Sequence, residues 1–356
     1  MTDILARRLD SLHISRTGLT TPAEVVRWLG AVQAQDYSGA KWSVGLRLPG
    51  MTDEGVEQAL ADRSIVRTWS LRGTLHLMAP EDIRWMLALI YPRMKIQLRF
   101  NLKRHAFSDD ELVRCYHILE KLLRDGVQAT RDEVRAALAD GGITVNNERV
   151  NFILVTAAIE GLICQGIRRK KEFTFTLLDE WVAPAPERTR EEALYACALR
   201  YFRSHGPATV ADFTWWTGLT LTEARLAVEL ARGELQEDIH NGQPVWFARQ
   251  TPEPATNTLF LLPGFDEYLL GYTDRTDALP KILEKEVNGT SNGLFLSTVV
   301  FDGKIEGIWR RSFRKDTAVI EIKPFKTFSA AKEKRIEKVA GQFARYAGMK
   351  AVELVR

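Results

Sequence analysis

The chain has 356 residues, of which 45% are hydrophobic, 9% aromatic and 27% charged. At roughly 100 to 200 residues per domain this length predicts two to four domains, and the apolar content excludes wholesale disorder. No stretch approaches the ~18 uninterrupted apolar residues of a membrane helix, and residues 1–10 are too charged for a signal peptide. We therefore expect a cytoplasmic protein with no membrane partner.

The cysteines and histidines indicate no cofactor. The three cysteines are odd in number and far apart in the sequence, which argues against disulfides and against a Cys-x-x-Cys motif. The six histidines never fall at a ligand spacing such as His-x-x-x-His, so we expect no metal site. The sequence also lacks GxGxxG after a strand, a phosphate-binding P-loop, GxSxG and HExxH. These absences leave nucleotide cofactors, hydrolase elbows and zinc peptidases without support.

The net charge of +3 is mildly basic, but the cations are clustered. Residues 83–108 contain no acidic side chain, and Lys95, Arg99 and Lys103 recur every four residues, which would place them on one helix face. Each cluster alone is more often a solvated face, whereas three together favour a polyanionic partner. The other two clusters are Arg168, Arg169, Lys170 and Lys171, and Arg310 and Arg311 with Arg314 and Lys315.

A group of helices followed by a two-stranded hairpin occurs three times, most clearly in residues 188–250. Threonines at helix starts, two of them with a glutamate three residues on, predict its three helices. The third helix should pack through Leu221, Ala224, Leu226 and residues 228–230. Asn241-Gly242 between two short apolar runs predicts a hairpin turn. Three helices and a hairpin predict a winged helix. The helix-start positions are Thr189 with Glu192, Thr209, and Thr220 with Glu223.

The second copy covers residues 106–185. A helix at 109–126, a capping box of Thr130 and Glu133, and a third helix at 147–160 precede strands at 162–166 and 172–178. The basic cluster at 168–171 would lie at the tip of this wing, where winged helices contact the phosphate backbone of DNA.

The first copy covers residues 1–105. Thr21-Pro22-Ala23-Glu24 predicts a helix start, and apolar residues carry this helix to about Val32. A loop, a helix at 53–63 and a hairpin closed by Leu71-Arg72-Gly73 follow. Beyond 250–254, strands at 257–265, 294–301, 304–313 and 317–325 and a final helix at 328–346 predict a β-rich unit at 256–356. The predicted fold class is α+β.

Gln33 and Gln35 lie where the first of these helices ends. In an extended segment their side chains would point the same way, whereas in a helix they would diverge by about 200°. Spacing alone favours the plainer interpretation, in which both glutamines cap or solvate a helix end. Asp266 and Glu267 could be an acid pair, but the preferred interpretation is that they are satisfied carboxylates near Arg275.

The first hairpin carries four further candidates, Arg67, Trp69, Arg72 and His76. An aromatic ring beside arginines can stack on a base or a sugar, although a tryptophan on a small hairpin more often belongs to the core. Leu75 and Leu77 would point opposite to His76, so His76 should leave the core if the leucines fill it.

Four segments together resemble the winged-helix DNA glycosylase family of AlkZ and YcaQ, and they occur in the family's order over most of the chain. The resemblance implies three tandem winged helices and a β-rich C-terminal unit in a C-shaped clamp that excises alkylated bases and, in AlkZ, unhooks interstrand crosslinks. We expect a monomer that acts on double-stranded DNA with alkylated bases. The segments are AVQAQDYSGAKWSVGLR (31–47), RTWSLRGTLHLM (67–78), LLPGFDEYLLGYTDR (261–275) and DGKIEGIWRR (302–311).

The family signature is Gln, an apolar residue and Gln in AlkZ-like members, or Gln-x-Asp in YcaQ-like members. Gln33-Ala34-Gln35 fits the first form, and Asp36 lies one residue late for the second. The resemblance therefore implies that Gln33 and Gln35 are catalytic. We expect DNA contacts from the four hairpin candidates, from Arg168, Arg169, Lys170 and Lys171, and from Arg310 and Arg311.

The leading hypothesis is a cofactor-free glycosylase for cationic N7- or N3-alkylated purines, associated with the nucleoid when bound to DNA. One alternative is a non-enzymatic winged-helix transcriptional regulator, against which the lack of an obvious ligand-binding or dimerisation segment argues mildly. Another is a set of winged helices that bind protein.

Overall fold

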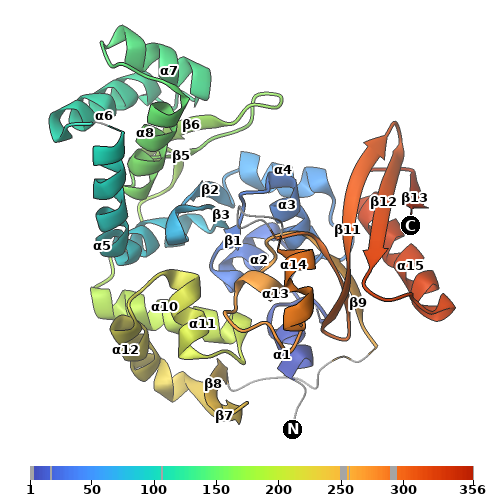
Figure 1. Ribbon diagram of the computed structural model, residues 1–356. Helices are drawn as coiled ribbons and strands as arrows, with labels where there is room; N and C mark the ends of the chain where they lie inside the picture. Colours follow the sequence, from blue (N-terminus) through green and yellow to red (C-terminus); the bar gives the residue numbers. More distant parts are fainter. Residues whose placement is uncertain are drawn as a thin grey trace.

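The computed structural model describes residues 4–16, 18–105, 107–248, 255, 257–288 and 295–355. It contains helices and mostly antiparallel sheets in separate units, which confirms the α+β class. Figure 1 shows the N-terminal elements near the centre, with the second and third helical groups on one side and the C-terminal sheet on the other.

The first two helical groups share one order: a helix, a short strand, two helices and a hairpin. Their sheets are also alike, because the short strand pairs with the last strand of the hairpin in both, in the orders β1-β3-β2 and β4-β6-β5. The first group is α2 (Pro22–Leu29), β1 (Val32–Gln33), α3 (Tyr37–Gly45), α4 (Asp53–Ala61), β2 (Val66–Trp69) and β3 (Leu75–Met78). The second is α6 (Asp109–Leu123), β4 (Ala129–Thr130), α7 (Arg131–Asp140), α8 (Asn147–Ile159), β5 (Ile163–Gln165) and β6 (Thr174–Leu177).

The third group repeats this order, with a single β-bridge between Ala208 and Trp246 in place of the short strand. Its elements are α10 (Arg190–His205), α11 (Val210–Thr217), α12 (Leu221–Ala231), β7 (Leu235–His240) and β8 (Gln243–Ala248). The order is consistent with three winged helices, and the predicted bounds 1–105, 106–185 and 188–250 remain our proposed division of the chain.

Helix starts and turns follow their predicted chemistry. Capping boxes form at Thr21, Thr130, Thr189 and Thr220, each with a glutamate three residues on. The turn between β7 and β8 has positive φ at Asn241 and Gly242, 48° and 74°, as a type I′ hairpin requires.

The helix α5 (Pro80–Arg104) joins the first group to the second and contains no acidic side chain after its first turn. Outside the three groups, α1 (Ile4–Ser11) precedes the first and α9 (Leu178–Trp181) follows the second. None of the helices within the described ranges is long and apolar enough to cross a membrane.

The C-terminal unit is built on a sheet ordered β13-β12-β11-β10-β9. The predicted final helix, α15 (Ala330–Tyr346), does not end the chain, because β13 (Ala351–Val355) follows it and pairs parallel with β12. The predicted linker at 250–254 lies outside the described residues. The remaining elements are β9 (Leu259–Leu262), α13 (Glu267–Leu270), α14 (Glu284–Val287), β10 (Thr298–Phe301), β11 (Lys304–Arg314) and β12 (Thr317–Pro324).

Two helix predictions were wrong in detail. The first predicted helix ends at Leu29 rather than Val32, because Gly30 closes it with a φ of 83°, and α3 occupies the predicted loop. In α12 the buried face is Ala224, Ala227, Val228 and Ala231, while Leu221 and Leu226 are 45% and 44% exposed. The alanines follow the i, i+3, i+7 spacing of one helix face, and α10 packs against this helix.

Candidate active site

Gln33 is the last residue of β1, and Gln35 lies in the bend between β1 and α3. Gln33 pairs with His76 of β3, and the Ala34 amide donates to the Leu75 carbonyl at 2.7 Å. Ala34, between the two glutamines, is buried. Gln33 is 8% exposed and Gln35 is exposed.

Each glutamine amide is held at the tip of the first wing. The Gln33 Oε1 accepts a hydrogen bond from Nη2 of Arg72 at 3.1 Å, and the Gln35 Oε1 accepts one from the Leu75 backbone amide at 3.3 Å. A carbonyl oxygen has two lone pairs. These contacts therefore orient both amides and use one lone pair of each oxygen.

Arg72 connects the first wing to the third helical group. It lies in the tight turn between β2 and β3 with a φ of 56°, and its Nη1 donates to the backbone carbonyl of Trp216. Burial lowers the pKa of Arg72. The same guanidinium thus contacts Gln33 and the end of α11. Arg72 therefore positions Gln33 relative to the third helical group.

Arg67 holds the backbone of the motif. Its Nε and Nη2 donate to the Ala34 carbonyl at 3.2 and 2.8 Å, and its Nη1 donates to Gln165 Oε1 in the second group. The guanidinium lies 4.2 Å from the centre of the Phe173 ring. Burial lowers the pKa of Arg67 to about 10, so it stays charged at neutral pH.

Asp266 and Glu267 are satisfied carboxylates, as the preferred interpretation held, but Arg275 is not their partner. Asp266 is buried and accepts from Arg47 through both oxygens, at 2.9 and 3.1 Å; Arg47 and the Ser43 hydroxyl help to hold its pKa low against burial. Arg275 instead donates to the Leu269 carbonyl.

Glu267 lies next to the backbone of Gln33. One of its oxygens is 3.4 Å from the Gln33 backbone amide. The other accepts from Trp216 Nε1 at 2.9 Å and is 3.1 Å from His205 Nε2. With 1% of its surface exposed, Glu267 supports the backbone of the motif and has no direct access to a bound duplex.

Trp69 and His76 are both interior residues. Trp69 is 6% exposed and stacks on Phe175 of the second group, so it belongs to the core. The expectation that His76 leaves the core was wrong, since it is 1% exposed. β3 is the middle strand of its sheet, and His76 Nδ1 lies 3.1 Å from the Ser70 hydroxyl. Burial lowers the pKa of His76 to about 3, so the ring is neutral.

The burial of Arg67, Trp69 and His76 does not favour the direct DNA contacts expected of them. As part of a predicted hairpin, these residues were expected at the protein surface. The second helical group covers that surface, because β2 packs against β5. Arg72 is only partly exposed, and its guanidinium is engaged by protein groups on two sides.

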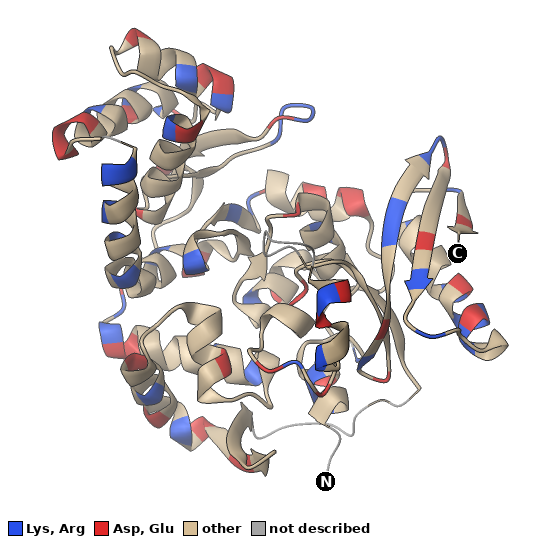
Figure 2. Ribbon diagram, viewed as in Figure 1, with Lys and Arg blue, Asp and Glu red and all other residues tan. Residues whose placement is uncertain are grey.

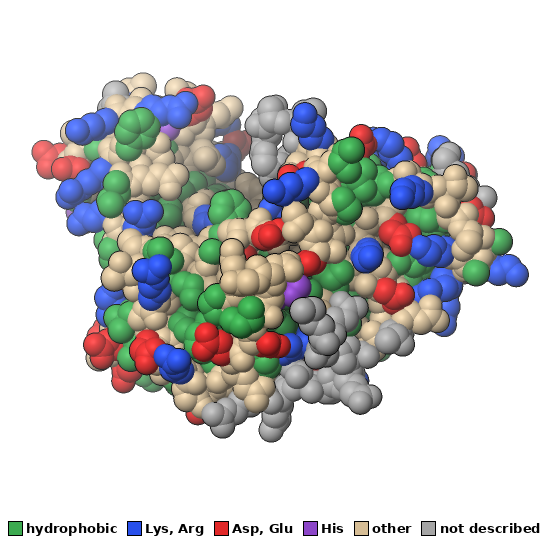
Figure 3. Space-filling model, turned by 60° about the horizontal axis from the view of Figure 1, so that its bottom comes forward, with side chains coloured by type: hydrophobic (Ala, Val, Ile, Leu, Met, Phe, Trp, Pro, Cys, Tyr) green, Lys and Arg blue, Asp and Glu red, His purple; other side chains and the backbone are tan. Residues whose placement is uncertain are grey.

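The second wing presents its cations as expected from its position, and Figure 2 shows them at the tip of the β5–β6 hairpin. Two of the four are engaged by protein groups: Arg169 pairs with Glu133 at 2.7 Å, and Arg168 lies over the Tyr37 ring. Lys170 and Lys171 are exposed. On the face shown in Figure 3, acidic and basic side chains are intermixed instead.

The C-terminal sheet reaches the motif through Arg311. Its Nη2 is 3.3 Å from Asp36 Oδ2, while the other oxygen of Asp36 accepts from the Gly39 amide and caps α3. Arg310, the next residue of β11, is exposed. The structure thus assigns Asp36 a structural contact that its spacing did not reveal, although an aspartate at a helix start was an available signal.

Among the described residues, no group of three or more His, Cys, Asp or Glu side chains is arranged to hold a metal ion. The three cysteines are buried as free thiols. The model of the family described as "DNA glycosylase AlkZ-like" matches residues 26–346, most of the chain. The chain belongs to this AlkZ-like DNA glycosylase family. It is therefore an N-glycosidic hydrolase that acts on DNA.

Two comparisons agree with this assignment. The chain is 27% identical over 365 aligned positions to an interstrand DNA cross-link repair glycosylase of Streptomyces sahachiroi, covering 97% of this chain and 96% of that protein. The solved structure of the Streptomyces sahachiroi DNA glycosylase AlkZ superposes with a TM-score of 0.80 at 25% identity and covers both chains completely. The AlkZ-like fold therefore extends through the C-terminal sheet.

Proposed function

We propose that this glycosylase excises cationic alkylated purines, such as N7- and N3-alkyl adducts, with Gln33 and Gln35 as the catalytic pair. The observation that carries the proposal is that both amides are oriented by groups of the first hairpin, with Gln35 exposed. The carboxylates nearest to the pair are already engaged: Asp36 by α3 and Arg311, and Glu267 by Trp216 and His205.

Such a site suits a substrate whose leaving group is already activated. An amide is not a general base near neutral pH, but it can hold a water molecule and direct its carbonyl dipole at positive charge. Cleavage of a glycosidic bond passes through an oxocarbenium-like sugar, which is the charge that such dipoles stabilise. A cationic purine departs without protonation. A neutral base such as uracil would need a proton that this pair does not supply.

DNA contacts are assigned to exposed cations rather than to the first hairpin. In this proposal Lys170 and Lys171 at the second wing and Arg310 on β11 bind phosphates, while Arg67 and Arg72 position the motif. Phosphate contacts dominate affinity. Binding and chemistry should therefore respond to different substitutions.

Interstrand crosslinks are proposed as further substrates. The relative from Streptomyces sahachiroi is described as a cross-link repair glycosylase, and the exposed amide of Gln35 supports the same activity here. A base tied to the opposite strand cannot easily rotate into a closed pocket, whereas an exposed catalytic group can act on it in place.

The test is incubation of the purified protein with three matched duplexes that differ at one position: N7-methylguanine, uracil, or an N7-linked crosslink. We expect free base from the first, none from the second, and unhooked strands from the third. Release of uracil at a rate similar to that of N7-methylguanine would contradict the proposed chemistry. Failure on the crosslink alone would limit the enzyme to monoadducts.

A further inference from the structure

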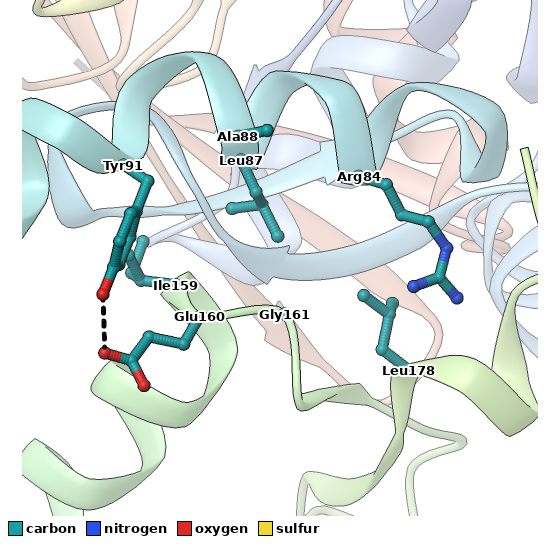
Figure 4. Close-up of a pocket in the computed structure, with 8 residues that line it drawn as sticks. All are labelled: Arg84, Leu87, Ala88, Tyr91, Ile159, Glu160, Gly161 and Leu178. Carbon is teal, nitrogen blue, oxygen red and sulfur yellow. Dashed lines mark hydrogen bonds between the residues drawn. The ribbon is translucent and has the colours of Figure 1, made fainter. Parts of the chain in front are cut away.

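The helix α5 is bonded to its surroundings in its first half. Figure 4 shows this half beside α8 and α9, around a hollow of about 500 Å³, with Tyr91 directed at Glu160. The Tyr91 hydroxyl donates to Glu160 Oε1 at 3.1 Å, and Arg84 forms an ion pair with Asp179 at 2.6 Å. The other two charged side chains of this half, Glu81 and Asp82, pair with Arg27 and Arg200 of the first and third groups.

The second half of α5 is different. Met94 and Leu98 are its buried residues, and most of the others are exposed. It carries five cations, and none of them forms an ion pair with a residue that the structure describes. Figure 2 shows them along the helix. They are Arg93, Lys95, Arg99, Lys103 and Arg104.

Two apolar side chains accompany these cations. Ile96 is 66% exposed and Phe100, one turn further on, is 69% exposed, so they share a helix face. Large apolar groups this exposed, set among cations, are unusual for a purely solvated helix. Proteins that bind DNA use such side chains against bases and sugars, with cations on the flanking phosphates.

This half of α5 is continuous with the glutamine site. Ile96 and Phe100 line a hollow of about 570 Å³ together with Arg72, the residue that bonds Gln33. A neighbouring hollow of about 490 Å³ extends past Gly73 to the first residues of α8. One carboxylate, Glu148, lies on the rim of the second hollow.

We propose that the exposed half of α5 is a DNA-binding surface that carries a strand of the duplex away from Gln33 and Gln35. Lys95, Arg99 and Lys103 advance by about 6 Å per step along the helix. This step corresponds to the rise of roughly two nucleotides along the axis of a duplex, at about 3.4 Å each. Phe100 and Ile96 contact the bases or sugars between the held phosphates. The inference rests on DNA as the substrate of the family and not on the alkylpurine chemistry proposed above.

The test compares variants of matched charge. Lys95→Gln, Arg99→Gln and Lys103→Gln are combined, and the control combines Lys334→Gln, Lys338→Gln and Arg345→Gln, which are exposed on α15. The affinity for an undamaged duplex is measured by fluorescence anisotropy at several salt concentrations. The α5 variant should lower the log-log salt slope by about 0.9 for each phosphate that it no longer neutralises. The control should match the parent.

Phe100→Ala should weaken binding by about fivefold or more without changing the slope, because an aromatic ring neutralises no phosphate. Because Phe100 is exposed, its replacement should not disturb folding. Circular dichroism checks the folding of every variant. Parent-like affinity and slope in the α5 variants would overturn the proposal, whether or not the enzyme releases alkylated bases. Binding of α5 to anionic lipid vesicles with an unchanged DNA slope would overturn it as well. Loss of base release with intact DNA binding would instead contradict the glutamine chemistry.

Discussion

Replacing Arg67 by methionine tests whether this residue positions the glutamine motif or contacts DNA. The change removes two hydrogen bonds to the Ala34 carbonyl and one to Gln165. Hydrogen bonds from charged groups contribute about 1.5–3 kcal/mol each, and a buried carbonyl without a partner costs about 1–3 kcal/mol. Because these contributions are not additive, we expect the free energy of unfolding to fall by about 3 kcal/mol.

The same change should slow base release by about 10 to 100-fold, because the glutamine segment loses its fixed position. DNA affinity should stay within about twofold and its salt slope should not change, since Arg67 is 4% exposed and is not available to phosphates. Single-turnover base release, anisotropy and urea denaturation measure the three quantities. Arg310→Met, at an exposed position, is the control and should show the opposite pattern. Lower DNA affinity and slope with unchanged stability in Arg67→Met would refute the reasoning.

Three further predictions concern single side chains or pairs. Lys170→Ala with Lys171→Ala should lower the salt slope of duplex binding by about 0.9 for each phosphate left without its lysine; an unchanged slope would mean that this wing faces solvent. Asp266→Asn should lower the free energy of unfolding by about 3–5 kcal/mol, because Arg47 is left buried without its ion-pair partner. In the parent, the lowered pKa of Asp266 gives stability that is present above pH ~4 and lost below it. The pKa of His76 is lowered to about 3, so the free energy of unfolding of the parent should fall by up to about 1.4 kcal/mol per pH unit between pH ~6.5 and 3. His76→Gln should flatten this pH dependence, measured by urea denaturation at several pH values.

Local chemistry made much of the fold predictable. Capping boxes and the Asn241-Gly242 turn depend on neighbouring residues, and they gave the helix starts and the hairpin of the third group correctly. The helix α3 was missed because it lacks an amphipathic pattern: it is buried on nearly all sides from Gly39 to Gly45. The only sequence signal for its start was the N-cap residue Asp36, a single position that is easily overlooked.

The packing of the site depends on contacts between residues far apart in the sequence. Arg67 and Gln165 are 98 positions apart, Arg72 and Trp216 are 144 apart, and Arg311 and Asp36 are 275 apart. No local pattern encodes such pairs. For this reason the first hairpin was expected to face DNA, although neighbouring units cover it and its arginines hold the motif instead.

In the proposed mechanism, Gln33 and Gln35 perform the chemistry. The most direct measurement is single-turnover release of N7-methylguanine by the parent, by Gln33→Ala, by Gln35→Ala and by the double variant, at saturating enzyme. We predict that each single variant is slower by about 10² to 10³, the usual scale for losing one preorganised polar group, with duplex affinity close to that of the parent. Excision by the double variant at the parental rate would contradict the account.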